Sequence, residues 1–302
     1  MREPIPASRR PIDRTDDAVN DQVLDGPHGP LRVRVYTPSA PAGPGLVWVH
    51  GGGFAAGEID MPEADWVAER FAERGIAVVS VDYALAPLPR TRAAAAGAPE
   101  RAGVHYPVAS DEVEFAFRWA VESGLARGPW SLGGASAGGN LATGAALRLS
   151  HGTGPVPALA VLAYPTLHAV QGAPDAALRA ALDSDPDADV FGPEPVRGMY
   201  ENYLGGPIED ADIYAVPGTA SVAELRGFPA TIMITGEVDE LRVSGEAFAA
   251  ALRDAGVDLD ISIEPGTRHG HLNQPELAAA TASIDRFAAR ILATSPENKE
   301  QP

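Results

Sequence analysis

Gly134-Ala135-Ser136-Ala137-Gly138 lies where a predicted strand gives way to a predicted helix. It follows the β-prone run Pro129–Gly133 and precedes an alanine-rich helical run, Asn140–Leu149. A serine between small residues at a strand-to-helix turn is the G-x-S-x-G pattern, in which a sharp turn lifts the hydroxyl to the end of a sheet. Because glycine and alanine are common, the five residues alone fit an ordinary turn equally well, so the interpretation depends on partners elsewhere in the chain.

Apolar runs of strand length alternate with helical stretches on both sides of this turn. After a hairpin at residues 22–36, this alternation predicts a mostly parallel sheet covered by helices on both faces. The 302 residues suffice for a single large α/β domain, residues 1–302. The expected strands are Leu46–Val49, Ile76–Val81, Ala158–Tyr164, Ala230–Thr235 and Leu259–Ile263, and the expected helices outside the turn are Asp65–Arg74, Asp111–Ser123, Arg242–Ala255 and Pro275–Leu292.

Three segments interrupt this alternation. Residues 165–227 are rich in Asp, Pro and Gly, with short helical pieces near 176–182 and 195–204, and we expect them to cover one end of the sheet. Thr91–Gly103 is rich in Ala, Gly and Arg and is typical of a surface insertion. Residues 1–20 form a polar arm with prolines and no apolar core of a secretory signal.

The composition of the chain excludes several classes of function. The net charge of −18 argues against binding to nucleic acid or to an anionic membrane, because both need clustered Lys and Arg. The chain has no cysteine, which excludes disulfides, thiolate chemistry and cysteine-based zinc sites. It has no run of about 18 apolar residues that could span a bilayer.

A nucleophilic serine needs a base and a group that orients the base. The strand ending at Thr235 leads to an acidic run in which Asp239 competes with Glu237 and Glu240, and the two glutamates are expected to be solvated. The strand ending at Ile263 leads to His269 and His271. Acid and histidine thus follow the carboxyl ends of successive strands, where open α/β sheets place ligands.

The serine also needs donors for an oxyanion. The buried strand Leu46–Val49 ends at His50-Gly51-Gly52-Gly53, whose glycines allow consecutive N–H groups to point at one spot. The N–H of Ala137, which follows the serine, adds a further donor in the field of a helix N-terminus. We expect the ring of His50 to bond the loop backbone.

One acidic pattern superficially resembles a calcium-binding loop. Asp183, Asp185, Asp187 and Glu194 have suitable spacing, but Ala188 stands where the sharp turn needs glycine. We therefore predict a solvated acidic loop and no metal site.

Five motifs in order resemble the hormone-sensitive-lipase-like branch of α/β-hydrolases, the bacterial family IV-type esterases with an HGGG motif. The resemblance covers roughly residues 30–290. The motifs are His50-Gly51-Gly52-Gly53-Phe54, Asp82-Tyr83-Ala84-Leu85-Ala86-Pro87, Gly134-Ala135-Ser136-Ala137-Gly138-Gly139-Asn140, Asp239-Glu240-Leu241-Arg242 and His269-Gly270.

The resemblance implies an α/β-hydrolase fold with a mostly parallel eight-stranded sheet and a helical cap made from about residues 1–20 and 165–227. It implies a cytoplasmic carboxylesterase that needs no cofactor, acts on small esters with short acyl chains, and is a monomer or homodimer. By position, Ser136 is the nucleophile, His269 the base and Asp239 its orienter, because His271 occupies the family's aromatic position. The implied oxyanion donors are Gly52, Gly53 and Ala137.

Substrate contacts are less determined by the sequence. Phe54, Tyr83, Tyr164 and the segment Val190–Leu204 are candidate pocket walls, for which ordinary core packing is an equal alternative. The same catalytic residues would serve an amidase, a lactonase or a carbamate hydrolase, and the fold could also serve a non-catalytic small-molecule binder. Ala135 departs from the family, which commonly has an acid beside the serine.

Overall fold

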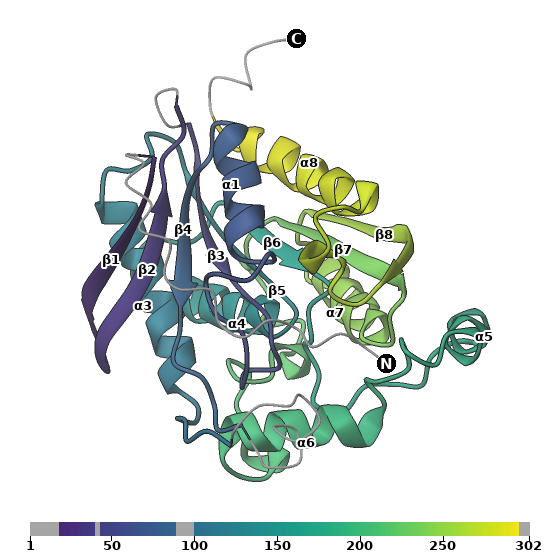
Figure 1. The fold of residues 1–302 in the computed structure, drawn as a ribbon. Coiled ribbons are helices and arrows are strands. Elements are labelled where there is room, and N and C mark those ends of the chain that lie inside the picture. The colour runs from purple at the N-terminus through teal and green to yellow at the C-terminus, as the bar shows by residue number, and fades with distance from the viewer. Residues whose placement is uncertain (1–17, 40–42, 89–99, 296–302) are drawn as a thin grey trace.

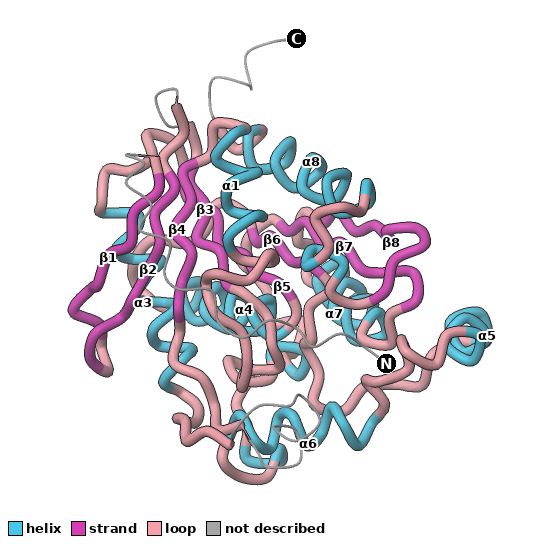
Figure 2. Tube along the Cα trace, in the orientation of Figure 1, coloured by secondary structure: helices cyan, strands magenta, loops and turns pink. Residues whose placement is uncertain are grey.

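The computed structural model describes residues 18–39, 43–88 and 100–295 (Figure 1). Eight strands form one sheet in the order β1-β2-β4-β3-β5-β6-β7-β8. Figure 2 shows these strands running through the centre of the molecule with helices around them. The strands are β1 (Val19–Gly26), β2 (Gly29–Tyr36), β3 (Gly45–Val49), β4 (Ala77–Asp82), β5 (Trp130–Ala135), β6 (Ala160–Ala163), β7 (Thr231–Val238) and β8 (Leu259–Arg268).

The sheet is mostly parallel, which confirms the prediction. The hairpin strand β1 pairs with β2, and β2 with β4, in antiparallel fashion, whereas all neighbours from β4 to β8 run parallel. Val49 pairs with Gly134, and Ala135 pairs with Ala163. The carboxyl ends of β3, β5 and β6 therefore meet at one level of the sheet.

Helices cover both faces of the sheet, as predicted. Figure 1 shows α1 and α8 side by side on one face, where Phe71 and Phe287 are fully buried. The second core lies under α3, α4 and α7 on the other face and includes Phe117 and Phe248. Burying one such side chain contributes about 1.5–3 kcal/mol. The helices are α1 (Asp65–Glu73), α3 (Val108–Glu122), α4 (Ala137–His151), α7 (Arg242–Asp254) and α8 (Ala278–Leu292). Over the described ranges, none of the helices has the length and apolar character to cross a bilayer.

The insertion after β6 carries α5 (Ala176–Ser184), α6 (Pro193–Leu204) and the short 3₁₀ turns η1 (Ile208–Asp210) and η2 (Pro217–Thr219). Figure 1 shows α6 across the carboxyl-end side of the sheet and α5 set apart at one edge. Tyr203 of α6 stacks on Phe54, with 4.1 Å between ring centroids. Leu178 and Leu182 of α5 form a small separate cluster with Ala188.

The predicted arm and surface insertion lie largely outside the described residues. Residues 1–17 of the expected arm and 89–99 of the expected surface insertion lie outside the described residues. Val19 and Asn20, which were assigned to the arm, begin β1 instead and pair with Tyr36 and Val35. The hairpin thus takes in two residues of the polar arm.

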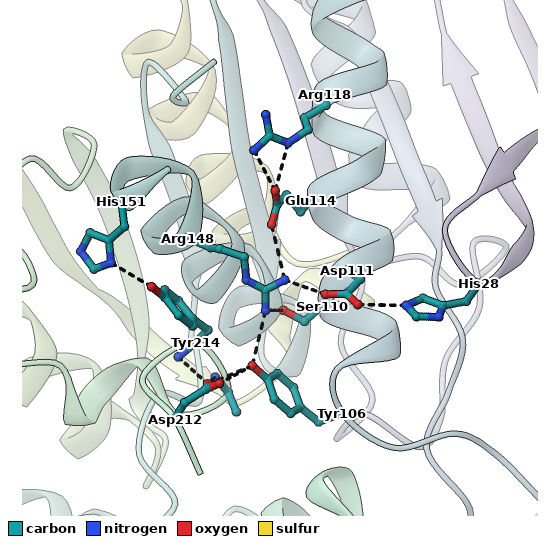
Figure 3. Close-up of polar contacts among 11 residues, drawn as sticks. His28, Tyr106, Ser110, Asp111, Glu114, Arg118, Arg148, His151, Asp212 and Tyr214 are labelled. Atoms are coloured by element: carbon teal, nitrogen blue, oxygen red, sulfur yellow. Dashed lines mark hydrogen bonds and ion pairs between the residues drawn. The ribbon is translucent and has the colours of Figure 1, made fainter. Parts of the chain in front are cut away.

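A polar network centred on Arg148 joins the insertion to the body of the domain (Figure 3). The guanidinium of Arg148 donates to Asp111 (2.7 Å) and Ser110 (3.1 Å) of α3. Asp111 also contacts His28 of the hairpin turn at 2.9 Å. Tyr106 donates to Asp212 of the insertion at 2.8 Å. Arg148 therefore helps to hold α3 in place. Asp111 extends the network to the hairpin, and Tyr106, which accepts from Arg148, extends it to the insertion.

Replacing Arg148 with Met should lower the free energy of unfolding by about 1–2 kcal/mol, because the partly buried carboxylate of Asp111 loses a charged donor. Arg118→Met is the matched control: Arg118 pairs with Glu114 one turn away on α3, so its loss should cost at most about 0.5 kcal/mol. Urea unfolding measures both variants. Equal destabilisation by the two would contradict a central role for Arg148.

Candidate active site

Ser136 lies at the turn between β5 and α4 with φ 53° and ψ −118°. The turn is held by hydrogen bonds from the Ser136 N–H to the Ala163 carbonyl (2.9 Å) and from the Asn140 N–H to the Ser136 carbonyl (3.2 Å). A Cβ at Gly138 would lie 2.2 Å from the carbonyl oxygen of Val49, so only glycine fits there. The serine remains 8% exposed at the carboxyl end of the sheet.

The structure brings together the three residues predicted to act as a triad. The Oγ of Ser136 lies 2.9 Å from Nε2 of His269. The Nδ1 of His269 lies 2.8 Å from Oδ2 of Asp239. Asp239 is fully buried, and its Oδ1 accepts the N–H of Leu241 at 3.0 Å. This arrangement can accept the serine proton on the imidazole and stabilise the imidazolium that results.

The electrostatics favour a basic imidazole. Burial alone lowers the pKa of His269, but the charge of Asp239, its hydrogen bond and the charge of Glu63 outweigh burial and raise the pKa above its ordinary value of 6.5. The carboxylate oxygen of Asp239 accepts a hydrogen bond, so Nδ1 of the neutral imidazole carries the proton. Nε2, which faces the serine, is then free to accept one.

His271, the alternative base, points away from the serine. Its Nε2 lies 3.0 Å from the hydroxyl of Ser283 on α8, and the side chain is buried. Burial lowers the pKa of His271 to about 4, so it stays neutral where His269 titrates. The geometry thus separates two histidines that stand two positions apart in the sequence.

The glycine-rich loop after β3 lies beside the serine. Gly52 has φ +114°, and its carbonyl accepts the N–H of Ala56 at 3.0 Å, which closes a tight turn. Gly53 follows with φ +59°. Within the described part of the chain, the N–H groups of Gly52, Gly53 and Ala137 have no hydrogen-bond acceptor. These three backbone donors are therefore without an acceptor in the described protein, as an oxyanion site requires.

His50 supports this loop, as expected. Its Nδ1 donates to the Gly51 carbonyl at 2.7 Å, and its ring stacks on Tyr83 with centroids 4.5 Å apart. Burial lowers the pKa of His50 to about 4, which keeps the ring neutral. The hydroxyl of Tyr83 donates to the His50 carbonyl at 3.1 Å. The ring of His50 therefore fixes the start of the loop and does not reach the serine.

The three aromatic residues proposed as pocket walls lie behind the site. Phe54, Tyr83 and Tyr164 are each at most 2% exposed. Phe54 is covered by the α6 tyrosines, and the Tyr164 hydroxyl donates to Glu63 at 2.6 Å. The rings of Phe54 and Tyr83 are used in packing, whereas the ring of Tyr164 also contacts that of His269, with centroids 4.9 Å apart. Phe191, from the other proposed wall segment, does reach the site: its ring contacts that of His269, with centroids 4.5 Å apart.

Sequence reasoning missed one residue and misjudged another. Glu63 accepts hydrogen bonds from three loops of the site, through the Gly51 N–H, the Tyr164 hydroxyl and the Asn273 amide. No motif contains Glu63, and the only signal in the sequence is its position 12 residues after Gly51. Glu240, expected to be solvated, is 4% exposed. Burial beneath the segment that carries Asp189 and Phe191 raises the pKa of Glu240.

The acidic pattern of residues 183–194 pairs with arginines. Arg179 contacts Asp183 (2.8 Å) and Asp189 (2.6 Å), and Arg268 contacts Asp185. The described residues contain no group of three or more His, Asp or Glu side chains that could hold a metal ion.

Comparisons with known proteins agree with this fold. A family described as alpha/beta hydrolase fold matches residues 46–273. The carboxylesterase NlhH of Mycobacterium tuberculosis is 30% identical over 260 residues, which cover 83% of this chain and 74% of the relative. The ethyl acetate hydrolase of Pseudomonas putida is 30% identical over 264 residues, covering 84% and 75%. An esterase structure from Pyrobaculum calidifontis has 30% identity and a TM-score of 0.76, covering 91% of this chain and 85% of that one.

His269 should titrate above pH 6.5. Asp239→Asn should lower the pKa of His269, because the negative charge that opposes the effect of burial is removed. Neutral imidazole, the form that accepts a proton, is lost as the pH falls through this pKa. Long-range ¹H–¹⁵N NMR of the ring nitrogens measures both proteins, with His50 and His271 as internal references. A wild-type pKa below 6.5, or one unchanged in Asp239→Asn, would contradict the electrostatic argument.

Proposed function

The chain belongs to the α/β-hydrolase family, in its hormone-sensitive-lipase-like branch, and on that premise we propose that Ser136, His269 and Asp239 hydrolyse carboxylic esters through an acyl-enzyme. The observation that carries the proposal is the continuous set of contacts from Ser136 Oγ through His269 to Asp239, at 2.9 and 2.8 Å. These contacts supply nucleophile, base and orienter in one place.

The reaction follows from these positions. Nε2 of His269 takes the proton of Ser136 as Oγ attacks the ester carbonyl carbon. The carbonyl oxygen becomes an anion and binds the N–H groups of Gly52, Gly53 and Ala137. The imidazolium then gives its proton to the leaving alcohol as the C–O bond breaks. His269 then takes a proton from a water molecule as the water attacks the acyl carbon, and it returns this proton to Oγ of Ser136 as the C–Oγ bond breaks and the acid leaves.

We also propose that residues 165–227 form a cap over this site and limit the size of the ester. Phe191 supports the proposal, because it comes from the insertion and packs on the catalytic imidazole. One similar protein is named an ethyl acetate hydrolase, which fits a preference for short acyl chains. A cytoplasmic location, a monomeric or homodimeric state and the absence of a cofactor remain part of the proposal.

Ser136→Ala should lower kcat for p-nitrophenyl butyrate by about 10⁴–10⁶-fold, because the attacking oxygen is removed while the backbone donors remain. Circular dichroism and urea unfolding should match the wild type. Ser131→Ala is the control, since this serine is buried within β5 and should keep nearly full activity. Hydrolysis retained by Ser136→Ala would refute the proposed nucleophile, and an inactive wild type would favour a small-molecule binder.

A panel of p-nitrophenyl esters from C2 to C12 should give its highest kcat/KM at or below about C6 and a fall of at least tenfold at C12, because a capped site excludes long chains. The same panel should include an anilide, a lactone and a carbamate, since the triad alone does not separate these substrates. Greater activity on one of these three would replace the ester assignment. Greater activity on C12 would contradict the cap.

A further inference from the structure

We propose that Glu63 is a positioning residue for this hydrolysis, because its buried carboxylate ties the oxyanion loop to the loop that carries His269. The inference rests on the proposed function, which assigns the roles of Ser136, His269 and the loop donors. Glu63 lies between the glycine-rich loop and α1 and is 2% exposed. It touches none of the reacting atoms and would act through its neighbours.

One oxygen of Glu63 holds the oxyanion loop. Its Oε1 accepts the N–H of Gly51 at 2.7 Å. A Cβ at Gly51 would lie 2.6 Å from this oxygen and 3.0 Å from the Cβ of Ser136, so the Gly51 backbone is confined between the two side chains. Gly52, the next residue, carries the first proposed donor. The carboxylate therefore sets where the donors lie relative to the serine.

The other oxygen holds the opposite side of the site. Its Oε2 accepts the Tyr164 hydroxyl at 2.6 Å and the amide of Asn273 at 3.0 Å. The ring of Tyr164 packs edge-on against that of His269, with centroids 4.9 Å apart. Asn273 lies four residues after His269, in the same loop after β8. Loops that follow β3, β6 and β8 thus converge on one side chain.

The charge of this carboxylate also faces the imidazole. Burial raises the pKa of Glu63 above its ordinary value, and the hydrogen bonds from Tyr164, Gly51 and Asn273, together with the charge of His269, offset part of this rise. Three donors already point at its two oxygens, an arrangement that favours the anion. The ionisable groups that face His269 are Asp239, Glu63, His271 and Tyr164, and the last two stay neutral. Glu63 also faces Tyr83, which is likewise neutral. Asp239 and Glu63 are the two groups whose negative charge raises the pKa of His269.

Glu63→Gln is the decisive variant, because it keeps the shape and one acceptor oxygen but removes the charge. We expect kcat for p-nitrophenyl butyrate to fall by about 10–100-fold, the effect of misplaced reacting groups, with KM within about threefold. The acid limb of the kcat/KM profile should move to lower pH, because loss of a nearby anion lowers the pKa of His269. A purely structural role would leave this limb in place.

Glu112→Gln is the matched control. Glu112 is also a buried carboxylate that accepts a backbone N–H, that of Ala84, and it lies outside both loops. The acid limb of the kcat/KM profile of Glu112→Gln should match that of the wild type. If Glu63→Gln keeps wild-type kcat, or loses activity with an unmoved acid limb as a destabilised protein would, the inference is wrong.

Two further variants keep the test decisive. If Glu63→Gln does not fold, Tyr164→Phe removes one donor to the carboxylate and keeps the ring; a lower kcat at similar KM supports the inference, and wild-type kcat overturns it. Ser136→Ala separates the two claims. Activity retained in Ser136→Ala refutes the proposed function itself, whereas its loss together with an unaffected Glu63→Gln refutes only the role of Glu63.

Discussion

The backbone of Ser136 is the constraint on which the rest of the site depends. Its φ of 53° lies in the left-handed region, which costs a non-glycine residue of order 1–3 kcal/mol and persists only where the surroundings enforce it. Here β6 and α4 enforce it through hydrogen bonds to the serine's N–H and carbonyl. The close crossing of Gly138 and β3 leaves no room for relaxation. Strain at this turn presents the hydroxyl to both the histidine and the loop donors.

The parallel sheet explains why so few residues complete the site. Strands β3, β5, β6, β7 and β8 lie next to one another in this order, so the loops after them meet along one edge. The loop after β3 contributes two donors, and the turn after β5 contributes the serine and the third donor. The loops after β6, β7 and β8 contribute Tyr164, the aspartate and the histidine. Two buried carboxylates hold these parts together, Asp239 by direct contact with the imidazole and Glu63 through backbone, hydroxyl and amide donors.

The sequence predicted the fold, and it predicted which serine, aspartate and histidine lie together in the structure, because the strand-to-loop positions of all three can be read from local patterns. Alternating strands and helices define the parallel sheet, and the positions of Ser136, Asp239 and His269 just after strands place them at the same edge. Glu63 could not be found this way: it is one of 41 acidic residues, and two of its partners, Tyr164 and Asn273, lie 101 and 210 residues away in the sequence. The aromatic residues failed for another reason. Phe54 stacks on Tyr203 of α6 and Tyr83 stacks on His50, and these contacts between segments far apart in the sequence bury both rings.

The central claim is that Ser136 is the activated nucleophile, and covalent trapping tests it most directly. The folded protein is incubated with a fluorophosphonate, digested, and analysed by peptide mass spectrometry. A single stoichiometric adduct on Ser136, whose rate of formation falls as His269 becomes protonated, is the predicted result. An unmodified Ser136, or an adduct on another residue in protein that still unfolds cooperatively, would contradict the claim.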